Sequence, residues 1–138
     1  MFRIATYADR HFDGVDALWR EAFPNDSPWN SASVAIPEKL RVQPELFLVA
    51  VAEDDVIGSV MAGYDGHRGW ISRIAVRQSN RLRGVGRSLL AEAERRLSAL
   101  GCTKINLQVV ASNASVTNFY KQAGYAVEER VSMSKRIL

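Results

Sequence analysis

Residues 70–100 form the stretch that most constrains the fold, because a strand, a glycine-bearing loop and a helix follow one another directly. Residues 70–76 form an apolar strand end, and a polar loop with Gly84 and Gly86 comes next. The helical run at residues 88–100 follows the loop, and apolar residues recur there at steps of three and four. The apolar residues of this helix are Val85, Leu89, Leu90, Ala93, Leu97 and Leu100.

The loop between this strand and helix has the properties of an anion site. Glycine lets the backbone approach a ligand closely, and the first N–H groups of a helix have no intrahelical partner. Helix-dipole attraction for an exposed charge is only about 0.3–1 kcal/mol, so the charges of Arg81, Arg83 and Arg87 add to it. The stretch therefore predicts a cradle for a diphosphate.

Two common phosphate-binding motifs do not fit this loop. Leu89 stands where the third glycine of G-x-G-x-x-G belongs, and no Lys-Ser or Lys-Thr follows Gly86 as in a P-loop. The pattern that remains is Arg81-x-x-Gly84-x-Gly86. On its own this pattern is also compatible with an ordinary helix start beside a solvated arginine cluster.

Length and composition predict a single globular domain over residues 1–138 with no membrane partner. A chain of 138 residues, 47% apolar and 24% charged, can support one core of respectable size. No apolar run approaches the roughly 18 residues of a membrane span, and the N-terminus lacks the pattern of a signal peptide. The lone Cys102 cannot form an internal disulfide, so we expect a cytoplasmic protein.

Basic residues are concentrated around the proposed anion loop. The formal net charge of +3, from 18 basic and 15 acidic side chains, is too small to predict a nucleic-acid partner. A basic stripe could instead hold RNA or DNA phosphates, but no aromatic residues for base stacking interleave with it. We therefore expect no nucleic-acid partner. The stripe consists of Arg73, Arg77, Arg81, Arg83 and Arg87.

Hydrophobic periodicity and turn residues predict alternating strands and helices along the whole chain. Pro37 is expected to open the second helix, Asp54-Asp55 to form a two-residue turn, and Gly101 to cap the long helix. The expected fold class is α/β (α+β), with a mixed, mostly antiparallel sheet flanked by helices on both faces. The predicted strands are residues 2–7, 46–52, 56–64, 70–76, 104–109, 125–129 and 131–137; the predicted helices are residues 13–23, 37–42, 88–100 and 111–123.

A second motif lies near the C-terminus. Residues 113–125 contain an Asn followed by a helix that bears Phe-Tyr and ends at Gly-Tyr. Together with the arginine and glycine loop, and with the same order of elements, this motif resembles the GNAT superfamily of N-acetyltransferases. Nearly the whole chain resembles the small bacterial YpeA-type members, including residues 28–30, 47–50 and 63–69. The resemblance implies the GNAT fold, with acetyl-coenzyme A as co-substrate.

The resemblance also implies roles for particular residues. Tyr120 would protonate the leaving thiolate, and Asn113 would bind the pantetheine arm or a water beside it. The strand end at residues 74–76 would pair with the arm and offer an N–H to the thioester carbonyl, where negative charge grows. Tyr120 could also be a packing aromatic and Asn113 a helix N-cap. The implied cofactor-binding residues are Ile74, Ala75, Val76, Arg81, Leu82, Arg83, Gly84, Val85, Gly86, Arg87 and Asn113.

The sequence contains no clear general base and no metal site. Residues 70–76 have no carboxylate, although many members of the family use one on this strand. His11 and His67 do not form a metal constellation, and Cys102 is expected to be a small packing residue. The remaining candidates for a base are Asp65, His67, Glu53 and Asp26, and each also fits a solvated turn or loop.

We therefore expect an N-acetyltransferase that moves the acetyl group of acetyl-coenzyme A to an amine by direct attack in a ternary complex. The expected acceptor is an amine-bearing small molecule or a protein N-terminus, bound with help from the loop at residues 24–31, which carries Trp29. A homodimer that pairs through edge strands is compatible with the resemblance. The alternatives are an acyl-coenzyme A-binding or sensing module without turnover, and a nucleic-acid-binding domain.

Overall fold

The computed structural model describes all 138 residues of the chain as two compact units, Met1–Gln108 and Val109–Leu138. The first unit contains a sheet and three α-helices, and the second contains one α-helix and the C-terminal segment. None of the helices is both long enough and apolar enough to cross a membrane.

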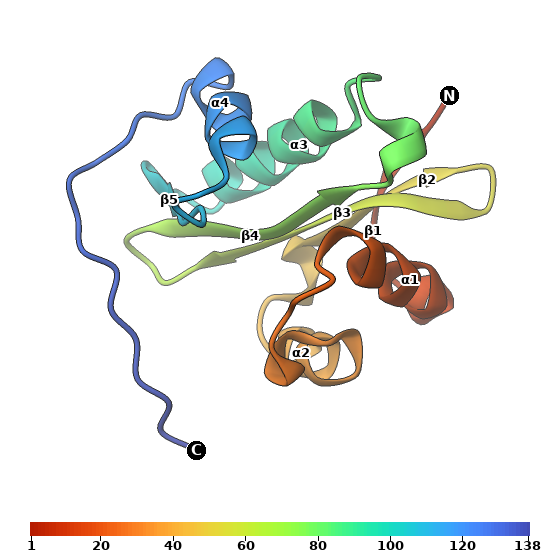
Figure 1. Cartoon of the computed structure of the whole chain (residues 1–138), viewed down its shortest axis with the longest axis horizontal. Coiled ribbons are helices and arrows are strands. Elements are labelled where there is room, and N and C mark those ends of the chain that lie inside the picture. Colours follow the sequence, from red (N-terminus) through yellow and green to blue (C-terminus); the bar gives the residue numbers. More distant parts are fainter. The chain divides into compact units, whose positions relative to one another are not determined.

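A five-stranded sheet forms the centre of the first unit, and its strands lie side by side in chain order (Figure 1). Neighbouring strands pair antiparallel except for the last two, which are parallel. The second and third strands are apolar runs that are buried almost throughout, as expected for strands covered on both faces. The strands are β1 (Arg3–Thr6), β2 (Phe47–Ala52), β3 (Asp55–Tyr64), β4 (Gly69–Val76) and β5 (Ile105–Leu107).

Helices cover both faces of this sheet. Helices α1 (Phe12–Ala22) and α2 (Ala32–Leu40) lie on one face, and α3 (Val85–Ala99) lies on the other (Figure 1). Each long helix buries one apolar side: α1 buries Val15, Leu18 and Trp19, and α3 buries the stripe predicted from its sequence except Leu100, which follows the helix and is exposed. The predicted α/β (α+β) class, with its mixed, mostly antiparallel sheet, is confirmed.

The second helix begins earlier than predicted. It starts at Ala32, after Ser31, so Pro37 lies inside the helix and does not open it. A proline inside a helix removes a backbone hydrogen bond, at a cost of about 3 kcal/mol. Against this cost, Ala32 and Ile36 lie one turn apart and are both buried in the core. Full burial of an isoleucine contributes about 1.5–3 kcal/mol, so tertiary packing is comparable in size to this cost and offsets the local preference of proline.

The turn between β2 and β3 is shifted by one residue from its predicted position. Ala52 pairs with Asp55, so the two turn residues are Glu53 and Asp54. Glu53 has a φ of 55°, in the left-handed region. Two-residue hairpin turns favour this region because it matches the right-handed twist of the strands. The predicted meander of three antiparallel strands is confirmed.

The long helix and the strand after it also differ slightly from prediction. Helix α3 starts at Val85, so residues 85–87, predicted as the end of the loop, form its first turn. Gly101 has a φ of 95°, and the N–H of Cys102 donates to the carbonyl of Leu97 at 3.1 Å, which confirms the predicted glycine cap. Strand β5 is shorter than the predicted residues 104–109.

The second unit contains helix α4 (Ala114–Gln122), close to the predicted bounds. Gly124, with a φ of 97°, follows the end of this helix. The prediction of closing strands at residues 125–129 and 131–137 is wrong, because no strand forms there. The apolar side chains of this segment, among them Val127, Val131 and Met133, are exposed. Alternation of apolar residues is not sufficient for a strand, which also needs a neighbouring strand to complete its backbone hydrogen bonds.

Glu92→Gln is expected to lower the melting temperature at pH 7 by about 3 °C, for a loss of about 1 kcal/mol. The Glu92 carboxylate on α3 accepts hydrogen bonds from the side chains of Arg95 and Arg96, each Nε at 2.9 Å. Arg96 also donates to Thr6 Oγ1 at 2.8 Å, so this cluster connects α3 to β1. The hydrogen bonds from Arg95, and then those from Arg96, lower the pKa of Glu92 to about 2.

The pH dependence of the Glu92→Gln effect is a check on this prediction. A folded-state pKa below the ordinary carboxyl value contributes stability above about pH 4.5, and this contribution is lost as the pH falls toward 2. Calorimetric melting at pH 7 and pH 2.5 measures the difference, with Glu38→Gln, an exposed carboxylate of α2, as the control. An equal loss of stability at both pH values would contradict the ion-pair explanation.

Candidate functional site

The predicted anion loop lies between β4 and α3 and is built from short local contacts. The N–H of Arg77 donates to the carbonyl of Ile57 at 2.9 Å and fixes the end of β4, and a single 3₁₀ turn, Gln78–Asn80, follows. Gly84 then precedes α3 with a φ of 79°, and no atom lies within 4 Å of the position that a Cβ would occupy. The loop is therefore open above Gly84, in a conformation that favours glycine.

The first turn of α3 offers free backbone donors to this loop. No side chain caps the helix at Gly84, and the first helical hydrogen bond runs from the N–H of Ser88 to the carbonyl of Gly84 at 3.0 Å. The N–H groups of residues 85–87 precede that bond, so they have no partner within the helix. These donors, with the positive end of the helix dipole, suit a phosphate group.

Close packing holds the start of α3 on the sheet. Val85 and Leu89 are buried, and both lie beside Gly58 of β3. A Cβ on Gly58 would come within 2.9 Å of Leu89 Cδ1 and 3.1 Å of the carbonyl oxygen of Ala75. Glycine at this position therefore allows α3 to approach the sheet closely, which fixes the N-terminus of the helix next to the end of β4.

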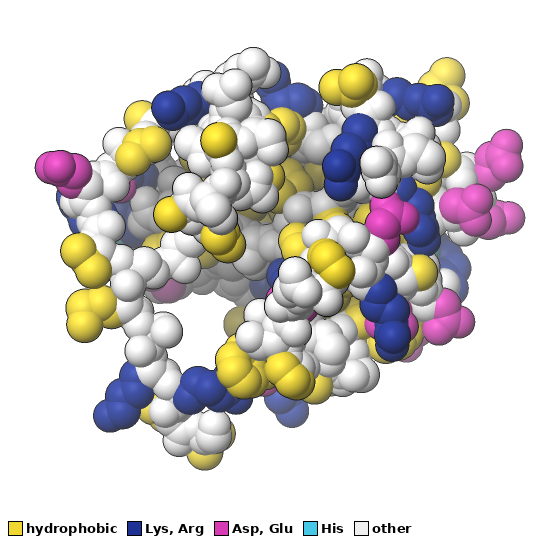
Figure 2. Space-filling view, in the orientation of Figure 1, with side chains coloured by type: hydrophobic (Ala, Val, Ile, Leu, Met, Phe, Trp, Pro, Cys, Tyr) yellow, Lys and Arg dark blue, Asp and Glu magenta, His cyan; other side chains and the backbone are white.

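The five arginines of the basic stripe lie in two different environments. Arg81, Arg83 and Arg87 are exposed, and Figure 2 shows basic side chains over the loop before α3, while acidic side chains gather at the β2–β3 turn. Arg73 and Arg77, however, are ion-paired to carboxylates of α1 and of the loop that follows α1. The expectation that the basic charge of all five arginines lies at the anion loop is therefore wrong for these two, because their side chains lie on the side of the sheet that α1 covers.

Strand β4 has a free edge beyond its first residues. Its parallel pairing with β5 runs from Gly69 to Ile71 and stops there. On the other side, β4 stays paired with β3 to its end at Val76. The backbone groups at residues 72–76 that face β5 therefore have no strand partner. This gap between the two strands is where the resemblance expects the pantetheine arm, beside Ile74, Ala75 and Val76.

The second unit contains the remaining two predicted site residues. Asn113 is the N-cap of α4 and its side chain accepts a hydrogen bond from the N–H of Val116 at 3.3 Å, so the N-cap interpretation is confirmed. Tyr120 is buried, and its ring contacts the rings of Phe119 and Tyr125. Burial raises the pKa of Tyr120 to about 12, so the phenol keeps its proton at every physiological pH.

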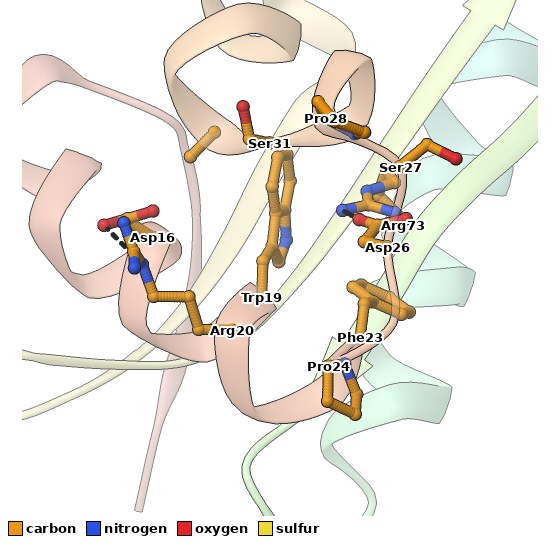
Figure 3. Close-up of a pocket in the computed structure, with 11 residues that line it drawn as sticks. Asp16, Trp19, Arg20, Phe23, Pro24, Asp26, Ser27, Pro28, Ser31 and Arg73 are labelled. Atoms are coloured by element: carbon orange, nitrogen blue, oxygen red, sulfur yellow. Dashed lines mark hydrogen bonds and ion pairs between the residues drawn. The ribbon is translucent and has the colours of Figure 1, made fainter.

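A pocket of about 340 Å³ lies on the α1 side of the sheet, next to β4 (Figure 3). Trp19, Phe23 and Pro28 supply apolar walls, and Asp16, Asp26 and Arg73 supply charges. The sequence predicted that the loop at residues 24–31, which includes Asp26 and Pro28, helps bind the acceptor, but it gave no such role to Trp19, Phe23 or Arg73. The spacing of four between the aromatic residues Trp19 and Phe23, at the end of α1 and just after it, could have indicated a shared surface.

The four candidate bases are not gathered at one site. Asp65 accepts hydrogen bonds from the N–H groups of His67 and Arg68 at 2.8 and 2.7 Å, in the exposed turn before β4. These bonds lower the pKa of Asp65 and stabilise its ionised form. Glu53 is exposed in the β2–β3 turn, and Asp26 is paired with Arg73. No group of three or more His, Cys, Asp and Glu side chains is placed to hold a metal ion.

Comparison with known proteins identifies the class of protein that this fold and site represent. The model of the acetyltransferase (GNAT) family matches residues 12–125. An acetyltransferase of Pectobacterium atrosepticum is 36% identical over 135 residues, which cover 98% of this chain and 95% of the relative. The chain therefore belongs to the GNAT acetyltransferase family. The acetyltransferase class predicted from the two sequence motifs is confirmed, and members of this class act on amine acceptors.

Two solved structures share the fold. The PaiA N-acetyltransferase of Thermoplasma acidophilum, in complex with coenzyme A, superposes with a TM-score of 0.84 at 22% identity, over 95% of this chain and 93% of that one. AAC(6′)-Iy, in complex with the bisubstrate analogue CoA-S-monomethyl-acetylneamine, superposes with a TM-score of 0.82 at 19% identity, over 100% and 99% of the two chains. At these identities the likeness shows a common fold.

Proposed function

We propose that this protein transfers the acetyl group of acetyl-coenzyme A to an amine, by direct attack of the amine on the thioester in a ternary complex. A C–N bond forms as the C–S bond breaks. The amine loses a proton, and coenzyme A leaves as a thiol. The family, and the coenzyme A bound in two proteins of the same fold, support the choice of donor.

The observation that carries this proposal is the junction of β4 and α3. The open glycine loop presents the free N–H groups of residues 85–87 beside three exposed arginines. These groups fit a diphosphate, because they combine several backbone donors with positive charge. The free edge of β4, at residues 72–76, comes shortly before this loop in the chain. It fits an extended arm with amide groups, because such an arm can pair with the edge as an added strand would.

The proposed roles of the individual residues follow the chemistry of the thioester. A backbone N–H at residues 74–76 stabilises the negative charge that grows on the thioester oxygen. Asn113 binds the arm or a water beside it, in addition to capping α4. Tyr120 donates its proton toward the sulfur as the C–S bond breaks. The diphosphate contacts involve Arg81, Leu82, Arg83, Gly84, Val85, Gly86 and Arg87.

The proposed acceptor site is the pocket between α1, the loop that follows it and β4. Arg73, which lines this pocket, directly precedes Ile74 of the proposed thioester-binding strand end. A pocket of about 340 Å³ suits a small amine or the first residues of a protein N-terminus. An α-amino group is already about a tenth neutral at pH 7, so water is sufficient to remove its proton and no dedicated base is proposed.

Four further properties belong to the same proposal. The family match spans residues from both compact units, which supports one GNAT domain over residues 1–138. The single free Cys102 supports a cytoplasmic location. Neither a nucleic-acid nor a membrane partner is proposed, since Arg73 and Arg77 do not extend the basic stripe. A homodimer through an edge strand is compatible with the position of β1 and β5 at the two edges of the sheet.

A thermal-shift titration with acetyl-coenzyme A, coenzyme A and NADH side by side tests the donor site. We expect stabilisation of about 2.7 kcal/mol at a hundredfold excess over the dissociation constant, for the first two ligands only. A panel of amines, with release of the free thiol as readout, then tests turnover. No shift with either coenzyme would reject the donor site, and a shift without turnover of any amine would favour a sensing module.

A further inference from the structure

Arg73 occupies a strained position in a β-bulge of β4. Ser59 pairs with Ala75 and Met61 with Ser72, so the single residue between them on β3 faces both Arg73 and Ile74 on β4. Arg73 takes the left-handed conformation of this bulge, with a φ of 53°. Residues with a side chain rarely adopt this conformation, and such strain persists only where surrounding contacts hold it.

A buried chain of hydrogen bonds holds the bulge in place. The indole N–H of Trp19 donates to Ser59 Oγ at 2.9 Å, and Ser59 Oγ donates to the carbonyl of Arg73 at 2.9 Å. Ser59 is fully buried, and Trp19 is only 3% exposed. The chain therefore joins α1, β3 and β4 at one point, and it fixes the direction in which the Arg73 side chain leaves the strand.

The guanidinium of Arg73 connects β4 to the loop between α1 and α2. It lies over the rings of Trp19 and Phe23, with its Cζ 4.5 and 4.1 Å from the two ring centroids. Its Nη2 donates to Asp26 Oδ2 at 2.5 Å and to the carbonyl of Asn30 at 3.1 Å. Figure 3 shows the Arg73 and Asp26 side chains pointing toward each other at the wall of the pocket.

This pair is more than an ordinary surface ion pair. The side chains of Arg73 and Asp26 are only 15% and 24% exposed. Arg73 Nε is buried without a hydrogen-bond partner, and an unpaired buried donor opposes folding. Arg73 thus leaves its Nε–H without a hydrogen bond, while its Nη2 bonds to two points of the loop, Asp26 and Asn30. A residue that only packed in the core would need neither the buried unpaired donor nor the two bonds to the loop.

We propose that Arg73 is the positioning residue of the acceptor pocket. It fixes residues 23–31 to the bulge of β4. The distance between this loop, which forms the pocket wall that contacts the amine, and the strand end at residues 74–76 therefore stays constant. The pairing with Asp26 also neutralises the cation inside the pocket, which would otherwise repel a protonated amine. The choice of this pocket as the acceptor site rests on the proposed function.

Two variants separate positioning from charge: Arg73→Met removes the contact with Asp26 and Asp26→Asn weakens it, while the two change the charge of the pocket in opposite directions. Arg73→Met makes the pocket more negative, and Asp26→Asn makes it more positive. If Arg73 acts by positioning, both variants raise the KM of the amine, and we expect an increase of roughly tenfold or more. If only charge matters, the KM of a cationic amine falls in Arg73→Met and rises in Asp26→Asn, which would overturn the proposal.

Hydrogen–deuterium exchange of the full-length protein measures the loop without any acceptor. The N–H groups of Asp26, Asn30 and Ser31 donate to carbonyls within the loop, at 3.2, 2.9 and 3.2 Å. We expect their exchange to accelerate roughly tenfold in both variants, and less in Arg73→Lys, which keeps the charge but not the planar fork. Arg95→Met, which removes an exposed ion-paired arginine on α3, is the matched control.

The outcomes distinguish failure of this proposal from failure of the proposed function. Unchanged exchange in both variants would show that other contacts hold the loop and would overturn the proposal, even if the enzyme acetylates amines. Faster exchange with an unchanged KM for spermidine, kanamycin and a peptide with N-terminal alanine would also overturn it. If the wild-type protein acetylates none of these probes, the proposed function is in question. Accelerated exchange would then still support the attachment of residues 23–31 to β4 by Arg73.

Discussion

Gly84→Glu is expected to abolish the binding of coenzyme A. Gly84 precedes α3 with a φ of 79°, where a residue with a side chain is strained. The space above it is open, so the new side chain meets no steric clash. Its carboxylate would lie beside the free N–H groups of α3 and compete for them, and it would repel a diphosphate. Isothermal titration calorimetry should detect no binding at coenzyme A concentrations that saturate the wild type.

The chain contains a matched control for Gly84→Glu. Gly66, in the turn between β3 and β4, also has a positive φ, of 95°, and open space around its Cβ position. Gly66→Glu therefore introduces comparable strain and the same charge away from the loop, and coenzyme A affinity should not change. Gly84→Ala introduces strain without charge and should give an intermediate affinity. Equal affinity in Gly84→Glu and the wild type would remove the loop from the binding site.

Tyr120→Phe is expected to lower kcat about a hundredfold, with little change in coenzyme A binding. A positioned proton donor contributes about 10²–10⁴ in rate, and phenylalanine keeps the ring that packs on Phe119 and Tyr125. Steady-state kinetics and calorimetry separate the two effects. Tyr125→Phe removes a neighbouring hydroxyl and is the control for general disturbance of α4. Equal kcat values for Tyr120→Phe and the wild type would exclude Tyr120 from the mechanism.

The raised pKa of Tyr120 defines how it acts and how the rate depends on pH. With the pKa of Tyr120 at about 12, full proton transfer to a free thiolate of pKa near 8.5 would be uphill by about 5 kcal/mol. In the proposed mechanism, Tyr120 would therefore donate a hydrogen bond as charge develops on sulfur, because complete transfer of its proton to the free thiolate is unfavourable. Its acid form is lost only above about pH 12, so kcat should not fall between pH 8 and 10 on account of Tyr120. A fall in this range that disappears in Tyr120→Phe would contradict this role.

Those features that depend on neighbouring residues were predictable from the sequence. Alternating apolar residues and turn residues defined β2, β3 and β4 to within one or two positions, and glycine predicted the end of α3. The open conformation of the loop also followed from its own glycines. In each case the physical determinant lies within a few residues of the element.

Features that depend on distant residues were not predictable. The early start of α2 depends on the burial of Ile36, which no local signal indicates. Apolar alternation at residues 125–137 gave a strand that does not form, because pairing partners are not encoded in the segment itself. Arg73 was assigned to the anion loop by its sequence neighbours, whereas a bulge directs its side chain to Asp26, 47 positions earlier. The contributions of Trp19, Phe23 and Arg73 to the pocket were missed for the same reason, although the loop at residues 24–31 was expected to help bind the acceptor.

The order of the strands has a consequence for how the protein folds. Because spatial order follows chain order from β1 to β5, the antiparallel pairs joined by short turns can form early, from contacts that are local in the chain. Strand β5 is connected to β4 by a crossover through α3, and it contributes a short parallel pairing. The gap proposed to receive the donor therefore lies beside a pairing between residues far apart in the chain, as the pairing of β1 with β2 also is. Ligand binding should then protect the edge of β4 beside this gap against transient opening.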